Sequence, residues 1–285
     1  MRYLFLRFPN GKPKAVTFSY DDATEQDLRL VKIFDKYNLK GTFNHMSDAF
    51  KGSRAIPKDV IEENFLKKGH EIAVHGAFHR ANGAVSYTSG IVDVLDCRRE
   101  LESKYGMIIR GMAYPDSGVS RRSTITDYQG IKEYLTKLGI SYARTTVVTD
   151  RGDKFNLPAD WHLWNPTAHH NDKQIFEIIE EFLSYDSANA TVTRRTPMLL
   201  YIWGHSSEFD NQNNWERIEE IAQKVSGKEN VWYATNIEIY EYVEAFNRLV
   251  FSVDEKIIFN PTVKTLWLDV DGKSVKIEPN QTIYL

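Results

Sequence analysis

Short runs of apolar, β-favouring residues alternate along this chain with longer runs in which apolar residues recur every three or four positions. The first kind predicts strands and the second predicts amphipathic helices. Predicted strands are Lys14–Tyr20, Gly41–His45, Glu71–His75, Ile109–Tyr114, Ile140–Arg144, Met198–Gly204 and Val231–Thr235. Predicted helices are Glu25–Asn38, Lys58–Lys68, Gly90–Tyr105, Gly130–Leu138, Asp172–Leu183 and Asn214–Val225. This order predicts a parallel α/β sheet, and seven such units favour closure into a barrel.

The last part of the chain has a different pattern. From Phe251 to Leu285, short β-type runs are separated by turn sequences. Asp271-Gly272 lies between two such runs, which is a strong signal for a hairpin. We therefore expect a main barrel domain over residues 1–250 and a small β appendage over residues 251–285.

Composition excludes some classes of protein. The 285 residues carry a formal charge of −3, which gives no sign of a nucleic-acid-binding surface. No apolar run approaches the ~18 residues of a membrane span. Arg2 and Arg7 interrupt the apolar N-terminus, so we expect no signal peptide and a cytoplasmic protein. The single cysteine, Cys97, falls in a helical pattern and is predicted to be a buried, inert thiol.

The first candidate site residues are Asp21 and Asp22, which follow a predicted strand. Adjacent side chains at a strand end diverge, so one carboxylate can bind a metal while the other acts as a base beside it. The alternative is a simple turn or the N-cap of the next helix.

A pair of histidines, His75 and His79, follows another predicted strand. On a helical turn the two imidazoles would share a face and could chelate one ion. With Asp22 they would form an N₂O ligand set with an open position, which suits catalytic zinc, with cobalt, nickel or manganese as alternatives.

Three further segments end strands or precede helices. His205 closes a predicted strand and could donate a proton across the site. Tyr114-Pro115 closes another, and a backbone N–H near Asp116 could stabilise an oxyanion. His169, with His170 beside it, could bind substrate or metal, or its segment could cap the following helix.

These residues resemble the polysaccharide deacetylases of the NodB-homology family, carbohydrate esterase family 4. Residues 17–23 resemble the family motif Thr-Phe-Asp-Asp-Gly with two extra residues and Ala23 in place of Gly. Residues 75–79 resemble the His-x-x-x-His motif, with Gly76 where Ser or Thr is usual. Residues 113–118 retain part of the third motif without its arginine. Asp160-Trp161 resembles the fourth motif, and Leu199–His205 the fifth.

The resemblance implies a distorted (β/α)₇ barrel and a metal-dependent hydrolase that removes acetyl groups from carbohydrates. It implies that Asp21 is the base and His205 the acid, and that Asp22, His75 and His79 bind the metal. Tyr114, Pro115, Asp116, Trp161 and His169 are the expected substrate contacts. Because the motifs depart from the family pattern, a decayed carbohydrate-binding protein and a hydrolase of a non-sugar amide remain alternatives. The oligomeric state is left open.

Overall fold

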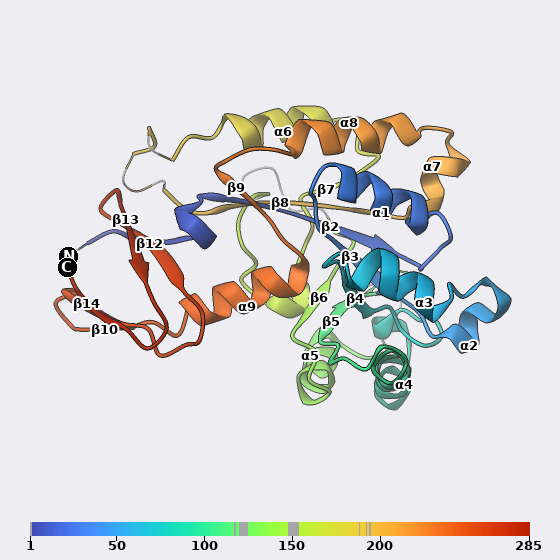
Figure 1. The fold of residues 1–285 in the computed structure, drawn as a ribbon. Helices are drawn as coiled ribbons and strands as arrows, with labels where there is room; N and C mark the ends of the chain where they lie inside the picture. The colour runs from blue at the N-terminus through green and yellow to red at the C-terminus, as the bar shows by residue number, and fades with distance from the viewer. Residues whose placement is uncertain are drawn as a thin grey trace.

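The computed structural model describes residues 2–116, 118–119, 125–147, 154–187, 189–191, 193 and 195–285. Ser117, which lies in the third motif, falls outside these residues. A curled parallel sheet forms the centre of the molecule, with helices along its outer face (Figure 1). This is the distorted (β/α)₇ barrel that the sequence predicted.

The central sheet has the strand order β6-β5-β4-β3-β2-β8-β7, and β9 pairs with the first half of β2. All of its ladders are parallel. Its strands are β2 (Lys14–Asp21), β3 (Gly41–His45), β4 (Glu71–Val74), β5 (Gly111–Ala113), β6 (Tyr142–Arg144), β7 (Ala168–His169), β8 (Met198–Gly204) and β9 (Val231–Tyr233). The carboxyl ends of these strands meet at one edge, where ligands bind in parallel α/β folds.

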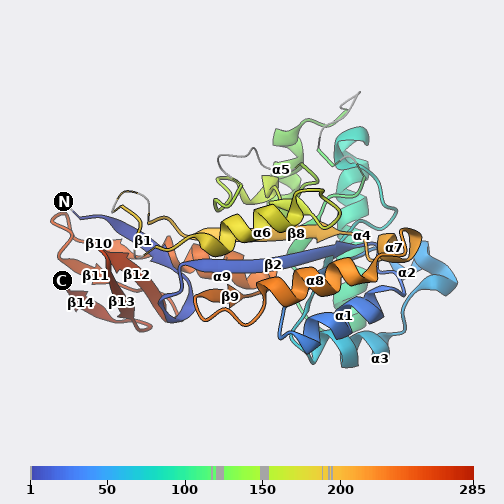
Figure 2. The ribbon, with the colours of Figure 1, turned by 90° about the horizontal axis from the view of Figure 1, so that it is seen from above.

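The longer helices lie on the outside of the sheet; α6 and α8 run along β2 and β8 (Figure 2). The α-helices are α1 (Asp27–Lys36), α2 (Asp48–Lys51), α3 (Lys58–Ile61), α4 (Tyr87–Tyr105), α5 (Tyr128–Lys137), α6 (Ile175–Ser184), α7 (Ser207–Asn211), α8 (Trp215–Val225) and α9 (Asn236–Phe246). The helix predicted over Lys58–Lys68 changes from α to π geometry at Glu62. Apolar spacing alone does not distinguish these two geometries.

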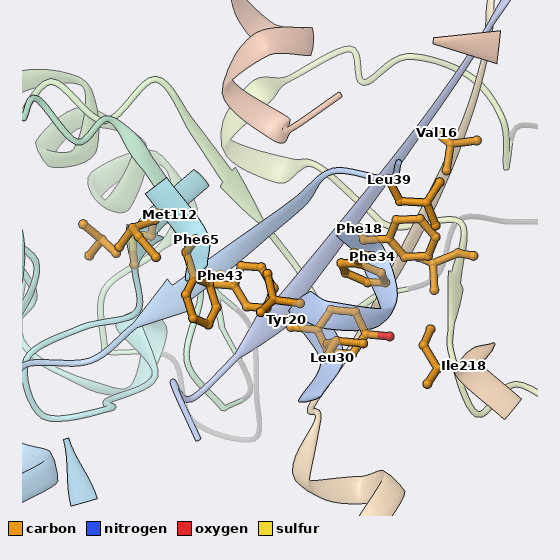
Figure 3. Packing of buried hydrophobic residues seen from close by; sticks show 14 of the residues in the cluster. Val16, Phe18, Tyr20, Leu30, Phe34, Leu39, Phe43, Phe65, Met112 and Ile218 are labelled. Atoms are coloured by element: carbon orange, nitrogen blue, oxygen red, sulfur yellow. The ribbon is translucent and has the colours of Figure 1, made fainter. Parts of the chain in front are cut away.

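Strand β2 separates the hydrophobic core from the barrel interior. Val16, Phe18 and Tyr20 point outward and pack with Phe34 of α1 and Ile218 of α8 (Figure 3). Successive strand residues face opposite sides, so the odd-numbered residues point into the barrel. There the Thr17 hydroxyl donates to the side-chain oxygen of Asn236, and the Asn44 amide donates to Ser19. The barrel interior is therefore polar along β2.

The barrel closes through an irregular segment between β6 and β7. Trp164 forms a parallel bridge with Arg144 of β6. Three residues later, the Thr167 N–H donates to the carbonyl of Tyr201 in β8. This segment replaces a regular strand pair and accounts for the distortion of the barrel.

Helix α9, which the sequence analysis did not predict, covers the amino ends of the strands. Thr235 and Glu238 form a capping box at its first turn. The Asn236 N–H donates to Thr42 of β3 and the Ile237 N–H to Glu71 of β4. The amino end of the barrel is thereby closed, which leaves the carboxyl end for chemistry.

The tail forms two antiparallel sheets beside α9 (Figure 1). Their strands are β1 (Leu4–Arg7), β10 (Val250–Phe251), β11 (Ile257–Phe259), β12 (Leu266–Val270), β13 (Lys273–Ile277) and β14 (Thr282–Tyr284). The predicted hairpin at Asp271-Gly272 joins β12 to β13. The N-terminal strand β1 pairs with β12, so both ends of the chain contribute to this part of the molecule. The domain division at residue 250 stays a prediction.

Two smaller expectations concern Cys97 and membrane spans. Cys97 is buried, and burial raises the pKa of its thiol to about 12, as expected for an inert thiol. Among the described residues, no helix combines the length and apolar character that crossing a bilayer requires.

Glu71 ties four elements together and offers a test of the fold. Its carboxylate accepts hydrogen bonds from Thr42, Tyr142 and the Ile237 N–H, at 2.9, 2.7 and 2.9 Å. Glu71→Ala leaves these buried donors unsatisfied, so the free energy of unfolding should fall by roughly 2–5 kcal/mol in urea titrations. The exposed Glu63→Ala should change it by less than about 0.5 kcal/mol. Equal effects of the two substitutions would contradict this role.

Candidate metal and acid–base site

Asp21 is the last residue of β2, and Asp22 begins the turn that follows it. Asp21 points into the barrel, whereas Asp22 turns toward the open end with a backbone φ of +79°. The Lys51 ammonium, on α2, donates to the Asp22 carbonyl at 2.7 Å and so supports this left-handed turn. One carboxylate is thus buried and the other is partly accessible.

Asp21 lies in a buried ion pair with Arg144 of β6. The Asn44 amide also donates to Asp21, at 2.9 Å. Burial by itself raises the pKa of Asp21, but Arg144, together with His75 and His205, holds that pKa below its ordinary value. The guanidinium also stacks over Trp203, 4.5 Å from the ring centre. Sequence analysis missed Arg144 because it looked for the arginine in the third motif, after β5.

His75 and His79 lie in a loop after β4, not on the helical turn that the sequence analysis considered. Gly76 and His79 adopt left-handed conformations, with φ of +76° and +52°. A Cβ at Gly76 would clash with Asp93 Oδ2, so glycine is required there for space as well as conformation. The Asp93 carboxylate accepts from the Phe78 N–H at 2.7 Å and fixes the loop that carries His79.

Three ligand-type atoms converge at this point. Asp22 Oδ1 lies 3.4 Å from His79 Nε2 and 3.6 Å from His75 Nε2. Two atoms bound at 2.0–2.1 Å to one tetrahedral ion stand about 3.3–3.5 Å apart, so this spacing fits a single zinc-like ion. Asp22 Oδ1 is buried and has no hydrogen-bond partner among the described residues. The arrangement fits a divalent metal better than an internal polar network.

The tautomer of His75 is also appropriate for a ligand. Its Nδ1 lies 2.9 Å from the carbonyl of Ala113 and must donate to it. The lone pair of Nε2 is then free for a metal, in the manner usual for metal-binding histidines. Burial lowers the pKa of His75, which favours this neutral form.

His205 stands across the site, just after β8. Its Nε2 lies 4.0 Å from both Asp21 Oδ2 and Asp22 Oδ2, and its Nδ1 lies 2.8 Å from Glu208. Burial by itself lowers the pKa of His205, but the bond to Glu208 and the charges of Asp21 and Asp22 outweigh it and raise that pKa to about 9. His205 is therefore a cation at neutral pH, able to give a proton from Nε2.

A second group, His169, His170 and Glu208, has its potential ligand atoms within 4.8 Å of one another. The Asn171 N–H donates to His169 Nδ1 at 3.1 Å, so the ring proton of neutral His169 sits on Nε2, which faces Glu208 at 3.4 Å. A proton, not a lone pair, points at the carboxylate. We interpret this group as a support for Glu208 and His205, not as a second metal site.

Of the expected substrate contacts, three lie beside the ligand cluster or its partners. Asp116 is exposed, and its charge contributes to raising the pKa of His79. Pro115 packs next to Gly76 in the ligand loop. His169 reaches the acid His205 through Glu208.

Two of the expected contacts do not face the ligand cluster. Tyr114 is 1% exposed, and its hydroxyl donates to the carbonyl of His162, so it belongs to the core. Trp161 packs against Tyr240, and its indole N–H donates to Glu244 of α9, which covers the amino ends of the strands. The weak Asp-Trp likeness gave no information on the direction of that side chain.

Comparison with known proteins supports the fold and the family resemblance. Residues 9–134 match the model of the family described as polysaccharide deacetylase. The matched part contains Asp21, Asp22, His75 and His79, whereas His205 lies beyond it. A comparison with curated proteins found no match.

Solved structures show the same fold at low sequence identity. PuuE allantoinase has a TM-score of 0.57 at 14% identity, over 82% of this chain and 91% of that one. A Mycobacterium smegmatis protein described as a putative polysaccharide deacetylase has a TM-score of 0.56 at 18% identity, over 85% of this chain and 94% of that one. A mutant of the peptidoglycan deacetylase PdaC of Bacillus subtilis has a TM-score of 0.50 at 15% identity, over 84% of this chain and 95% of that one.

The structure also simplifies the first motif. Strand β2 pairs continuously with β8 from Lys14 to Tyr20, without a bulge. Residues 19–23, Ser-Tyr-Asp-Asp-Ala, therefore correspond to Thr-Phe-Asp-Asp-Gly with no insertion, and the two extra residues of the sequence analysis are not needed. Ala23 takes the glycine position at φ +49°.

Metal binding should depend on the first group and not on the second. His75→Ala and His79→Ala remove ligand atoms, and each should weaken zinc binding by at least roughly 10-fold in calorimetric titration of chelator-treated protein. His169→Gln should leave zinc affinity unchanged. Loss of zinc in His169→Gln with retention in His75→Ala would reverse the two assignments.

Glu208 should control the charge of His205. Glu208→Gln removes the carboxylate that stabilises the imidazolium, so the pKa of His205 in metal-free protein should fall from about 9 toward its ordinary value. Titration of the imidazole by NMR measures this directly. Asp172→Asn, at a half-buried carboxylate after the same histidines, is the matched control. An unchanged pKa in Glu208→Gln would remove this role.

Proposed function

We propose that this chain, whose residues 9–134 match the polysaccharide deacetylase family model, is a metal-dependent hydrolase that removes acetyl groups from a carbohydrate. The observation that carries the proposal is the convergence of two carboxylates and three imidazoles at the carboxyl ends of β2, β4 and β8. Asp21, which is ionised, and His205, which is protonated, lie beside a set of potential metal ligands. That combination suits hydrolysis of an amide or ester.

Asp22, His75 and His79 are the residues that would hold the metal, with zinc as the expected ion. Such an ion, when bound, would polarise the acyl carbonyl and lower the pKa of its bound water. The unpaired Asp22 Oδ1 and the free Nε2 of His75 support this choice of ligands.

Asp21 is proposed as the general base. Its lowered pKa keeps it ionised at neutral pH, so it can accept a proton from the attacking water. Arg144 and Asn44 occupy some of its lone pairs and hold its orientation. An ionised carboxylate offers about four acceptor positions, so acceptor positions remain for the water.

His205 is proposed as the general acid. It is a cation at neutral pH, and Glu208 holds its Nδ1, so Nε2 can protonate the departing amine nitrogen. The Asp116 N–H, which donates to none of the described residues, would donate to the developing oxyanion. Base and acid then act from opposite sides of one acyl group.

The retained set of ligands, base and acid favours an active enzyme over a decayed binding protein. Glycine at position 76 is explained by its positive φ and by the lack of space for a Cβ. Ala23 keeps a positive φ of +49° without glycine. Although the third motif lacks its arginine, Arg144 supplies a guanidinium that pairs with the proposed base Asp21. The departures from the family pattern therefore do not remove any group that the proposed reaction uses.

Asp21→Asn separates catalysis from metal binding. Zinc content should be retained, because the three ligands are intact, while acetate release from N-acetylglucosamine oligomers should fall by roughly 10²–10⁴-fold. Acetate is measured enzymatically and zinc by elemental analysis of the same samples. Thermal unfolding serves as the control, since the substitution also removes the charge partner of Arg144.

Two outcomes would contradict the proposal. Full activity in a folded, zinc-containing Asp21→Asn variant would remove the base assignment. Absence of acetate release from any acetylated oligosaccharide by zinc-loaded wild-type protein would remove the proposed substrate class.

A further inference from the structure

A cavity of about 240 Å³ opens directly beside the ligand cluster. Asp22 and His79 form one side of it, and Phe50, Lys51 and Arg54 form the other. It adjoins a larger cavity of about 490 Å³, and the two share Thr24, Lys51 and Arg54. A substrate with its acyl group at Asp22 and His79 would extend past these two cationic side chains.

The two cations differ in how they are held. The Lys51 ammonium is largely buried and donates to the Asp22 carbonyl, so its position is fixed next to the cluster. Arg54 is exposed, and no hydrogen bond or ion pair joins its guanidinium to any described residue. A guanidinium without a partner at the mouth of a cavity is suited to bind a carboxylate or phosphate in a bidentate manner.

The carboxylates around the cavity do not cancel this charge. Asp48 on α2 is paired with Lys104 at 2.6 Å. Asp27 is buried and accepts a hydrogen bond from Ser206. Asp22 faces the imidazoles, and Glu25 lines only the larger, outer cavity. Two positive charges therefore remain close to the place where the acyl group would lie.

We propose that the substrate carries an anionic substituent, a carboxylate or a phosphate, close to its acetylated nitrogen, and that Arg54 and Lys51 bind this group. The inference rests on the proposed function and narrows its substrate class to acidic acetylated sugars. Phe50, which is 42% exposed, would cover the apolar face of the same sugar. Neutral N-acetylglucosamine units would leave Arg54 without a partner.

The test compares sugars that differ in one charged group. N-Acetylmuramic acid is N-acetylglucosamine with a lactyl ether on O3 that adds a carboxylate, and N-acetylglucosamine 1-phosphate carries a phosphate on O1. Both oxygens are on carbons next to the one that bears the acetylated nitrogen. The ratio of kcat/KM for each acidic sugar to that for N-acetylglucosamine should be roughly 10–100 in the zinc-loaded wild-type protein. Arg54→Gln should lower the ratio toward 1, and Arg54→Lys should restore part of it. The larger of the two ratios identifies the anion.

Arg99→Gln is the matched control. It removes the same charge from an exposed arginine of α4 whose one ion-pair partner in the described part of the chain is Asp96. The ratio should not change in this variant, whereas an equal fall would assign the preference to the overall charge of the protein. Such a fall would overturn the role of Arg54.

Calorimetric binding of the same three sugars to zinc-loaded protein separates this inference from the proposed function. If no sugar is deacetylated, but the acidic sugars bind more tightly and Arg54→Gln removes the difference, the anion site stands and the proposed reaction fails. If the sugars are deacetylated with equal kcat/KM and bind equally, the reaction stands and the anion site fails. If the acidic sugars do not bind more tightly than N-acetylglucosamine, the inference is overturned.

Discussion

The buried ion pair between Asp21 and Arg144 is the interaction on which the candidate site depends. Removing one partner of such a pair leaves an uncompensated charge and costs about 3–5 kcal/mol, so both residues must be retained together. Asn44 and the ring of Trp203 complete the surroundings of the pair. The left-handed turn at Asp22, supported by the Lys51 ammonium, then directs the next carboxylate toward the open end. The ion pair thus fixes Asp21, and the turn places Asp22 beside it.

Two polar networks shift the pKa values of Asp21 and His205 in opposite directions. Arg144 lowers the pKa of Asp21, whereas Glu208 raises the pKa of His205. Groups whose environments separate their pKa values in this way are suited to act as base and acid at one pH. His169 and His170, which the sequence analysis considered as ligands, contribute by surrounding Glu208. The pKa values of the proposed base and acid are therefore set by Arg144 and Glu208, which lie behind the residues that would touch the substrate.

Local patterns predicted most of the central sheet. The strands Gly41–His45 and Met198–Gly204 were predicted at their observed bounds, since continuous apolar or β-branched runs are distinctive in buried strands. Helix α9 was missed because it has apolar residues on more than one side, between the barrel and the β appendage. Trp161 was placed in the site on a two-residue likeness, whereas its direction is set by packing against Tyr240. The side on which a residue packs is decided by neighbours far away in the chain.

The sequence by itself determined the parallel α/β order, and it predicted five candidate site residues, because periodicity and the position of polar residues after strands are local properties. The five are Asp21, Asp22, His75, His79 and His205. The tertiary structure decided which of them approach one another, that Arg144 from β6 is the partner of Asp21, and that Arg54 borders the cavity beside Asp22 and His79. Arg144 is 123 positions from Asp21. Such a contact depends on the curvature of the sheet and the closure at Trp164, and no short-range pattern contains that information.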